Sequence, residues 1–384
     1  MDWNFLIKNR DSINVTTDSR KVTSGCVFVA LKGEHFDGND YVEQAEKDGA
    51  AYVIKGENAL AELQDLARAW RRKFAIPVIA ITGTNGKTTT KELTAAVLGT
   101  KYKVLYTEGN YNNSLGVPLT LLRLTAQHDI AIIEMGASHP GDIKELVEIA
   151  EPDYGLITNV GHAHLEGFGS FEGVMKTKGE LYEFLVAHNG VVFQNADNPY
   201  LKQMLPNYAK TITYHGSPML SGTHLVGDYN AENIQAACCV GAQFGISREE
   251  AEKAVRAYVP TNNRSQAMKT ERNELVVDAY NANPTSMQAA INAFKGDTYI
   301  LGSMRELGSY SHFEHQNIAN MLLERKADRV YLVGSEWRET TAPYPIFDNV
   351  EELAAHLQQH PLTHARALIK GSRANKLEQI IPYL

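Results

Sequence analysis

Residues 83–89 combine two glycines, a lysine and hydroxyl side chains in one short stretch, Gly83-Thr84-Asn85-Gly86-Lys87-Thr88-Thr89. Glycines let successive backbone N–H groups curve around an anion without a clashing Cβ atom. Lys87 brings positive charge to terminal phosphates, and the Thr88 hydroxyl can bind Mg²⁺. The pattern predicts a phosphate-binding loop for ATP, in which all seven residues from Gly83 to Thr89 contribute.

The flanking segments give this loop the surroundings that phosphate binding requires. An apolar, β-branched run at residues 78–81 predicts a buried strand, and residues 91–98 predict a helix that ends at Gly99. A helix N-terminus adds unpaired N–H donors and a favourable dipole. Only two residues separate Gly83 from Gly86, where the usual motif has four. The alternative is a glycine-rich turn with no ligand, but a Lys-Thr pair at the helix start argues against that alternative.

Further polar side chains follow other predicted strands. Glu134 ends the strand at residues 130–134, and His162 and His164 lie in the loop after a strand at residues 155–160. The carboxyl ends of parallel strands form the ligand crevice of such sheets, so an acid there can serve Mg²⁺. A histidine in such a loop can supply a metal ligand, although packing alone would also explain both histidines.

Two other sets of side chains allow alternative interpretations. Lys176 and Lys178 precede a helix predicted at residues 179–186, where lysines usually form a solvated face. Asn230 and Asn233 lie three apart in another predicted helix and therefore share one face. That pair could contact an adenine edge or cap the helix.

The order of the elements predicts an α/β protein with three domains. Residues 1–75 form a small α/β unit, residues 76–260 a central parallel sheet that carries the phosphate loop, and residues 261–384 a doubly wound domain of Rossmann type. The last unit alternates strands at 275–278, 298–302, 329–334 and 367–371 with helices at 286–294, 315–325 and 350–359. Its first strand is not followed by Gly-x-Gly-x-x-Gly, which argues against a dinucleotide site.

Length and composition limit the possible functions. The 384 residues suffice for two or three domains, and the net charge of −8 argues against a nucleic-acid polymer as partner. The three cysteines, Cys26, Cys238 and Cys239, form neither a disulfide framework nor a metal-binding spacing. Neither a signal peptide nor a membrane-spanning run is apparent. We therefore expect a cytoplasmic monomer that acts on small molecules and does not insert into membranes.

Several motifs together resemble the Mur ligase family of peptidoglycan synthesis, over essentially the whole chain. Besides the loop at 83–89, they are residues 110–118, Glu134-Met135-Gly136, residues 159–170, residues 278–284 and residues 301–308. The last two resemble most closely the family members that add D-alanyl-D-alanine to UDP-N-acetylmuramoyl-tripeptide. The resemblance implies that ATP activates the peptide carboxylate as an acyl phosphate, which the dipeptide amine then attacks.

The resemblance also implies roles for individual residues. Lys87, Glu134, His164 and Lys178 would form the catalytic centre, with two Mg²⁺ ions held by Thr88, Glu134, His164 and a carbamylated Lys178. The nucleotide would be bound by the phosphate loop together with Asn230, Asn233, Arg264 and Asp278. The substrates would be bound by Ser19, Arg20, Asn112, Asn113, Tyr280, Asn281 and Asn283.

The chain departs from the family pattern at a few positions. Tyr229 replaces a usual histidine, Asn263 precedes Arg264 where a glycine is usual, and two segments near 54–60 and 214–225 are short. Two other functions are compatible with parts of the pattern. One is a sister amide ligase with a different amine acceptor, and the other is a nucleotide-binding protein without catalytic activity. The third amino acid of the peptide, meso-diaminopimelate or lysine, does not follow from the sequence.

Overall fold

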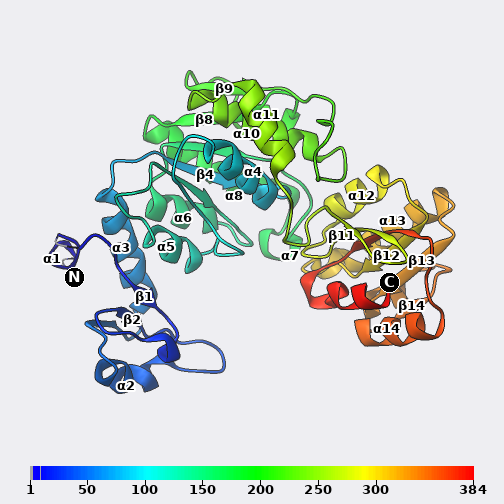
Figure 1. Ribbon diagram of the computed structural model, residues 1–384, viewed down its shortest axis with the longest axis horizontal. Coiled ribbons are helices and arrows are strands. Elements are labelled where there is room, and N and C mark those ends of the chain that lie inside the picture. The colour runs from blue at the N-terminus through cyan, green and yellow to red at the C-terminus, as the bar shows by residue number, and fades with distance from the viewer. Residues whose placement is uncertain (1–2, 9) are drawn as a thin grey trace.

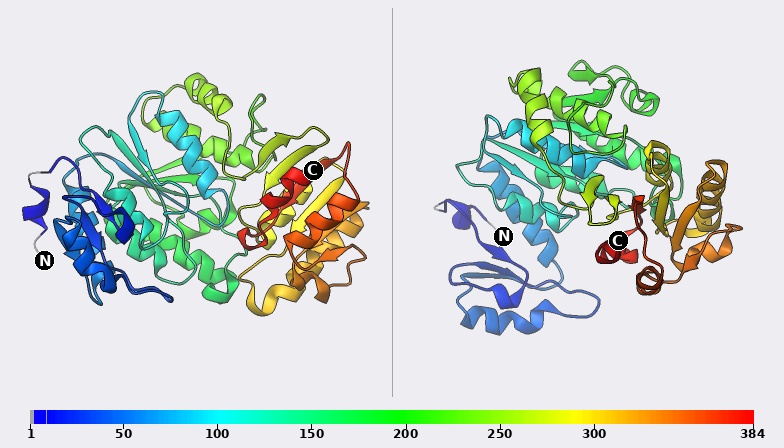
Figure 2. Two further views of the ribbon diagram at one scale, coloured as in Figure 1. Left: turned by 60° about the horizontal axis from the view of Figure 1, so that its bottom comes forward. Right: turned by 45° about the vertical axis from the view of Figure 1, so that its right-hand side comes forward.

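The computed structural model describes residues 3–8 and 10–384 and contains three separate sheets along the chain. The first and third sheets lie on either side of the central one (Figure 1). Two further views show the same arrangement, in which the central unit lies between the N-terminal and the C-terminal units (Figure 2). The predicted α/β class with three units is confirmed.

The N-terminal sheet has three parallel strands in the order β1-β2-β3. Its elements are α1 (Asn4–Ile7), β1 (Val15–Thr16), η1 (Ser19–Lys21), β2 (Val27–Val29), η2 (Gly38–Tyr41), α2 (Val42–Lys47) and β3 (Tyr52–Ile54). Helix α3 (Ala59–Arg72) follows and packs on β2 and β3 as well as on central helices. The domain limits at residues 75 and 260 stay predictions.

The central sheet has six parallel strands in the order β5-β6-β4-β7-β8-β9. These are β4 (Val78–Thr82), β5 (Val104–Tyr106), β6 (Ile130–Glu134), β7 (Tyr154–Ile157), β8 (Val191–Asn195) and β9 (Thr211–Tyr214). The helices are α4 (Lys87–Leu98), α5 (Gly116–Leu121), α6 (Asp142–Ala150), α7 (Leu165–Phe168), α8 (Phe171–Ala187), α9 (Pro199–Met204), α10 (Asn230–Gln243) and α11 (Arg248–Ala257).

Alternate side chains of β4 enter two different cores. Val78 and Ala80 pack with α3, α5, α6 and α8, whereas Ile79 and Ile81 pack with α4, α10 and α11. This alternation follows from the two-residue period of a strand, and burial on both faces explains the uninterrupted apolar sequence. The sheet is thus covered on both sides and can hold the loop after β4 rigidly.

The C-terminal sheet has the order β10-β11-β15-β12-β13-β14, with only the β10–β11 pair antiparallel. Its strands are β10 (Gln266–Lys269), β11 (Glu274–Asp278), β12 (Thr298–Gly302), β13 (Arg329–Val333), β14 (Ile346–Phe347) and β15 (Arg366–Lys370). The helical elements are α12 (Pro284–Ala293), η3 (Gly308–Tyr310), α13 (Ser311–Glu324), η4 (Ser335–Glu339), α14 (Val350–Gln359), η5 (Arg373–Asn375) and η6 (Leu377–Tyr383).

The structure begins several predicted helices earlier than the sequence indicates, α8 most of all, and adds short strands. Helix α8 begins at Phe171, not at residue 179, because Ser170 caps it by accepting a hydrogen bond from the Gly173 N–H. Two glycines within this helix lower its local propensity and hid its first turns. The strands that the sequence did not predict are β1, β5, β8, β9, β10 and β14. Between Tyr214 and Leu225 the structure describes no strand.

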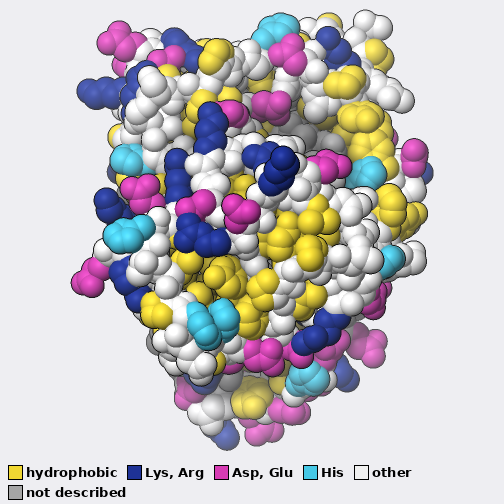
Figure 3. Space-filling model, turned by 90° about the vertical axis from the view of Figure 1, so that its right-hand side faces the viewer, with side chains coloured by type: hydrophobic (Ala, Val, Ile, Leu, Met, Phe, Trp, Pro, Cys, Tyr) yellow, Lys and Arg dark blue, Asp and Glu magenta, His cyan; other side chains and the backbone are white. Residues whose placement is uncertain are grey.

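The surface of the C-terminal side carries charges of both signs. On this face, basic and acidic side chains intermingle around patches of hydrophobic side chains, without an extended basic stripe (Figure 3). Such a surface offers no continuous track for a polynucleotide backbone. Among the described residues, no helix is both long enough and apolar enough to cross a bilayer.

Candidate active site

The phosphate loop joins β4 to α4 at the carboxyl edge of the central sheet. Gly83 and Gly86 have φ angles of 139° and 80°, a region that favours glycine. A Cβ atom at Gly83 would collide with the Thr158 hydroxyl, and one at Gly86 would collide with the Asn233 amide oxygen. Both glycines are therefore required by conformation and by close packing.

Lys87 begins α4 and folds back over the loop. Its Nζ atom donates hydrogen bonds to the carbonyl oxygens of Gly83 at 2.8 Å and Thr84 at 3.0 Å. Burial lowers the pKa of Lys87 to about 8, with a further decrease from the charge of Arg264 and an opposing effect of Glu134. An anion bound by the loop would raise this pKa again, because it stabilises the charged amine.

Glu134 ends β6 beside the phosphate loop and is almost fully buried, with an exposed fraction of 1%. Its Oε1 atom accepts hydrogen bonds from the Thr88 hydroxyl at 3.1 Å and the Asn112 side-chain amide at 2.8 Å. Its Oε2 atom is buried and has no hydrogen-bond partner. A buried carboxylate oxygen without a partner is costly, and Mg²⁺ would satisfy it. Thr88 and Glu134 therefore fit a magnesium ion.

The structure gives the two asparagines at 112 and 113 local partners. Asn112 lies at the Glu134 carboxylate, and Asn113 accepts hydrogen bonds from the N–H groups of Leu115 and Gly116 at the start of α5. Their predicted role in holding a sugar nucleotide therefore stays a prediction. The structure shows one further role for Asn112, which the sequence did not indicate: its side-chain amide orients the carboxylate of Glu134.

Lys178 lies inside α8, and only 2% of it is exposed. The interpretation of this lysine as part of a solvated face is wrong, because its side chain is buried and lies close enough to Lys87 for the two charges to affect each other. Within the described residues it makes no hydrogen bond or ion pair, and its Nζ atom lies 5.5 Å from the centre of the Phe168 ring. Burial, reinforced by the nearby charge of Lys87, holds the pKa of Lys178 well below its usual range.

His164 lies at the start of α7 with a φ of 51° and contacts a carboxylate oxygen of Glu306 from the third unit. His162 is more exposed and lies 3.9 Å from the Glu314 carboxylate. Among the described residues, no group of three or more His, Cys, Asp or Glu side chains could hold a metal. The second metal at His164 and Lys178 and the carbamate on Lys178 both stay predictions.

Asn230 and Asn233 do share one face at the start of α10. The Asn233 amide donates to the Asn230 side-chain oxygen at 2.9 Å, while its own oxygen accepts from the Thr90 hydroxyl at 3.0 Å. Asn230 donates to the Val226 carbonyl at 2.8 Å. The pair thus links α10 to the helix of the phosphate loop, and its predicted contact with adenine stays a prediction.

The third unit reaches the phosphate loop through Asn283. This residue caps α12 and donates a hydrogen bond of 2.8 Å to the side-chain oxygen of Asn85. The Thr285 hydroxyl also accepts a hydrogen bond of 3.1 Å from the His162 N–H. The loop after β11, which carries Tyr280, Asn281 and Asn283, is therefore held directly beside the phosphate loop.

Asp278 ends β11 and forms a partly buried ion pair that the sequence analysis missed. The Lys370 Nζ atom lies 2.5 Å from the Asp278 Oδ2 atom and also donates to the Asn281 carbonyl at 3.2 Å. The paired register of β11 and β15 sets these residues opposite each other. The sequence feature that could have predicted this pair is an acid and a base that each end a mostly apolar strand. Asp278 is thereby oriented, and its role toward the nucleotide stays a prediction.

The two predicted residues of the N-terminal unit lie in η1. Asp18 accepts hydrogen bonds from the backbone and side chain of Arg20, which is largely exposed. Ser19 is half-buried beside it. The hydrogen bonds from Arg20 lower the pKa of Asp18 to about 2. This exposed pair is far along the chain from the phosphate loop, and its role in substrate binding stays a prediction.

His315 supports the loop after β12, which carries Glu306. It is fully buried in α13, accepts a hydrogen bond of 3.0 Å from the Met304 N–H, and lies 2.7 Å from the Ser311 carbonyl. Nε2 is therefore the acceptor and Nδ1 carries the proton, so the ring is neutral. Burial lowers the pKa of His315 below its usual 6.5.

We expect His315→Gln to reduce the loss of stability in acid. The unfolded chain takes up the His315 proton near pH 6.5, whereas the folded chain takes it up only at lower pH. Stability therefore falls as the pH drops below about 6.5, by up to about 1.4 kcal/mol per pH unit, until the folded pKa is reached. Urea unfolding at pH 7, 6 and 5 measures this slope. His312→Gln, an exposed change in the same helix, should keep the wild-type slope. Equal slopes in all three proteins would contradict the assignment.

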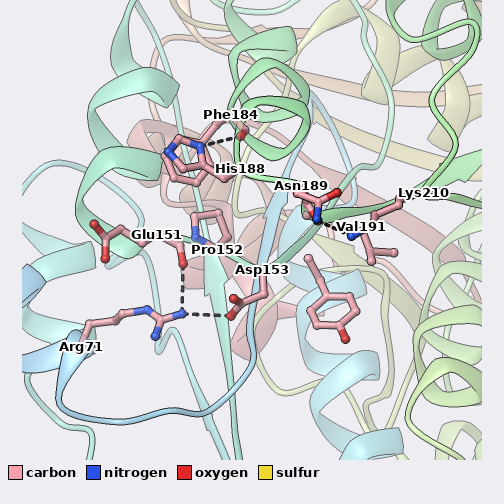
Figure 4. Close-up of a pocket in the computed structure, with 11 residues that line it drawn as sticks. Arg71, Glu151, Pro152, Asp153, Phe184, His188, Asn189, Val191 and Lys210 are labelled. Atoms are coloured by element: carbon pink, nitrogen blue, oxygen red, sulfur yellow. Dashed lines mark hydrogen bonds and ion pairs between the residues drawn. The ribbon is translucent and has the colours of Figure 1, made fainter.

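A separate cavity of about 570 Å³ lies at the amino ends of β7 and β8 (Figure 4). Arg71 donates hydrogen bonds there to the carbonyls of Ala150 and Glu151 and to the Asp153 carboxylate. Lys210 donates to the Asn189 carbonyl. These cations are already bound by the protein, and the cavity lies on the edge opposite the phosphate loop. The carboxyl edge of the sheet is therefore the better candidate for the site.

Comparisons with known proteins agree with this geometry. Three family models match the chain, the first two with an overlap: "Mur ligase family, catalytic domain" at residues 13–98, "Mur ligase middle domain" at 81–217, and "Mur ligase, glutamate ligase domain" at 263–378. The chain is 34% identical to the UDP-N-acetylmuramoyl-tripeptide–D-alanyl-D-alanine ligase of Bacillus subtilis and 33% identical to that of Escherichia coli. Each comparison covers 96% of this chain and 92% of the relative.

Solved structures of similar proteins show the same arrangement of elements. A crystal structure of MurF from Acinetobacter baumannii has a TM-score of 0.86 and 28% identity, and covers 96% of this chain and 92% of that protein. MurF ligase from Thermotoga maritima, in complex with ADP, has a TM-score of 0.85 and 28% identity, with 97% of both chains covered. Both similarities extend over all three units.

Proposed function

The chain belongs to the Mur ligase family, and from this premise we propose that it joins D-alanyl-D-alanine to UDP-N-acetylmuramoyl-tripeptide in an ATP-driven reaction. The observation that carries this function is the meeting of two loops from different units. Asn283 of the third unit hydrogen-bonds to Asn85 in the phosphate loop. A site built in this way can bring an activated carboxylate and an amine together.

The first step is the transfer of a phosphoryl group. The carboxylate of the tripeptide attacks the γ-phosphate of ATP, the bond to the β-phosphate oxygen breaks, and an acyl phosphate and ADP result. Two anions must approach each other, so the site has to supply positive charge. Lys87 is positioned over the loop for this purpose, and Arg264 is close enough to affect its pKa.

The second step forms the amide bond. The neutral amine of D-alanyl-D-alanine attacks the acyl carbon, the C–O bond to phosphate breaks, and inorganic phosphate leaves with the electron pair. The amine loses a proton when the amide forms. Water must be excluded, because it would hydrolyse the acyl phosphate. The contacts between Thr285 and His162 and between Asn283 and Asn85 support a closed arrangement around this step.

The proposed magnesium site uses side chains that the phosphate loop brings together. Thr88 and Glu134 would hold Mg²⁺, which would neutralise charge between the β- and γ-phosphates when bound. The unpartnered Oε2 atom of Glu134 supports this assignment. A carbamate on Lys178 would turn a buried cation into an anion, which His164 could complement in holding a second ion. The low pKa of Lys178 favours the unprotonated amine that reacts with carbon dioxide.

The test of this function is an assay of amine acceptors. Purified protein is incubated with ATP, Mg²⁺ and UDP-N-acetylmuramoyl-tripeptide, and phosphate release and product mass are followed. We expect phosphate release to require D-alanyl-D-alanine and to match its incorporation. Parallel tripeptides with meso-diaminopimelate or lysine as third residue identify the natural donor.

Two outcomes would contradict the proposal. Incorporation of D-glutamate or a diamino acid in place of the dipeptide would indicate a sister ligase. Nucleotide binding without any acceptor-dependent phosphate release would indicate a non-catalytic protein. A Glu134→Gln variant serves as the inactive control. It keeps the shape of the side chain and removes the charge, so phosphate release should be lost.

A further inference from the structure

The Tyr280 ring lies beneath two arginine side chains. The Cζ atom of Arg264 is 4.0 Å from the ring centre, and the Cζ atom of Arg373 is 5.3 Å from it. Tyr280 follows β11, and Arg373 follows β15, its parallel neighbour in the C-terminal sheet. These two residues therefore belong to loops at the carboxyl edge of one sheet, where such sheets bind ligands.

Neither arginine has a charge partner in the part of the chain that the structure describes. Among the residues that the structure describes, no carboxylate forms an ion pair with Arg264 or Arg373. The nearby Lys370, in contrast, is already paired with Asp278. Two guanidinium groups that share one ring repel each other, and an anion between or beside them would relieve that repulsion. The pair thus favours a negatively charged ligand.

The spacing of the two arginines suits a substrate with a reacting amine at one end and a carboxylate at the other. Arg264 affects the pKa of Lys87 and so lies toward the phosphate loop. The two Cζ atoms can be no farther apart than the sum of their distances to the ring centre. An extended dipeptide spans about 7 Å, at roughly 3.5 Å per residue. When the amine of the dipeptide lies beside the γ-phosphate, the carboxylate at the other end of the dipeptide is therefore within reach of Arg373.

A second observation comes from the residue before Arg373. The Ser372 hydroxyl is buried, with an exposed fraction of 4% for the residue, and has no hydrogen-bond partner. A hydroxyl can donate to a carboxylate oxygen, as a guanidinium does with bidentate geometry. An arginine without an acid and a serine without an acceptor are therefore consecutive at this strand end.

We propose that Arg373, assisted by Ser372, binds the terminal carboxylate of the D-alanyl-D-alanine acceptor. This inference rests on the proposed function and extends it to the acceptor end of the site. Arg373 is then the residue that selects a dipeptide with a free carboxyl group over a neutral amine of the same shape. Arg264 remains available for the phosphate.

The experiment compares D-alanyl-D-alanine with D-alanyl-D-alaninamide, whose terminus is neutral. In the wild-type protein we expect kcat/KM to be higher for the acid by about 10- to 100-fold, the range for a charge-assisted hydrogen bond. In Arg373→Met this preference should fall to nearly one, mainly through a higher KM for the acid, while the KM for ATP stays unchanged. Arg373→Lys should keep part of the preference, and Ser372→Ala should reduce it by a smaller factor.

Arg338→Met is the matched control, because Arg338 is an exposed arginine of the same unit that pairs with Asp348. It should retain the wild-type preference. Thermal unfolding and ADP binding verify that each variant is folded. An unchanged preference in Arg373→Met, or a rise in its KM for ATP instead, would overturn the inference alone. Failure of the wild-type protein to ligate the dipeptide at all would instead overturn the proposed function, and this inference with it.

Discussion

Replacing Lys87 by alanine should lower kcat/KM for ligation by at least about a hundredfold, the range found for removal of one group that stabilises developing charge. The Lys87 ammonium is positioned over the phosphate loop by the carbonyls of Gly83 and Thr84. Without it, transfer of the γ-phosphoryl group to a carboxylate loses the cation that neutralises the two approaching anions. Initial rates of phosphate release at several ATP concentrations measure the effect.

The fold should survive this change, because within the part of the chain that the structure describes the Lys87 side chain donates hydrogen bonds only to its own loop. Thermal unfolding of Lys87→Ala without nucleotide should therefore resemble that of the wild-type protein. Lys101→Ala, an exposed lysine just beyond the end of α4, is the matched control and should keep full activity. Turnover of Lys87→Ala at the wild-type rate would remove the phosphate loop from the mechanism.

Replacing Lys178 by alanine should also lower ligation by about a hundredfold or more, if the buried amine carries a carbamate that helps to hold a metal. The site is suited to this modification, because Lys178 has no hydrogen bond or ion pair within the described residues and a lowered pKa. Acetate or formate should partly restore the rate of Lys178→Ala, since a small carboxylate can occupy the space of the missing group.

A direct measurement separates modification from a purely structural role. Protein equilibrated with ¹³C-labelled bicarbonate should show a carbamate carbon signal that is absent from Lys178→Ala. Lys176→Ala removes an exposed lysine two positions earlier in the same helix and should change neither the signal nor the rate. Loss of activity without rescue and without a carbamate signal in the wild-type protein would contradict the assignment.

The phosphate loop was predictable because its information is local. The strand, the two glycines, the Lys-Thr pair and the helix are consecutive, and each residue type is required by backbone conformation or phosphate chemistry. The long strands at 130–134 and 298–302 were equally evident, since burial on both faces gives them uninterrupted apolar sequences. Short strands such as β5 and β14 at the sheet edges lack this signal.

The start of α8 shows how a local signal can mislead. Two glycines weaken the helical pattern before residue 180, so the sequence predicts a helix only from residue 179. The cap at Ser170 starts the helix at Phe171, so that Lys178 lies inside the helix and not before it. Burial of Lys178 then depends on how α8 packs against the central sheet, which propensity does not describe.

The sequence by itself determined the α/β class, the phosphate loop and the family, because contiguous residues carry each of them. Only the tertiary structure decided which distant side chains meet. Asn112 orients Glu134, Asn283 bonds to Asn85 and Lys370 pairs with Asp278. Arg264 and Arg373 share the Tyr280 ring. These contacts depend on strand order and on how the units dock. Sequence spacing does not encode such geometry, so the phosphate loop was evident from the chain while its partners were not.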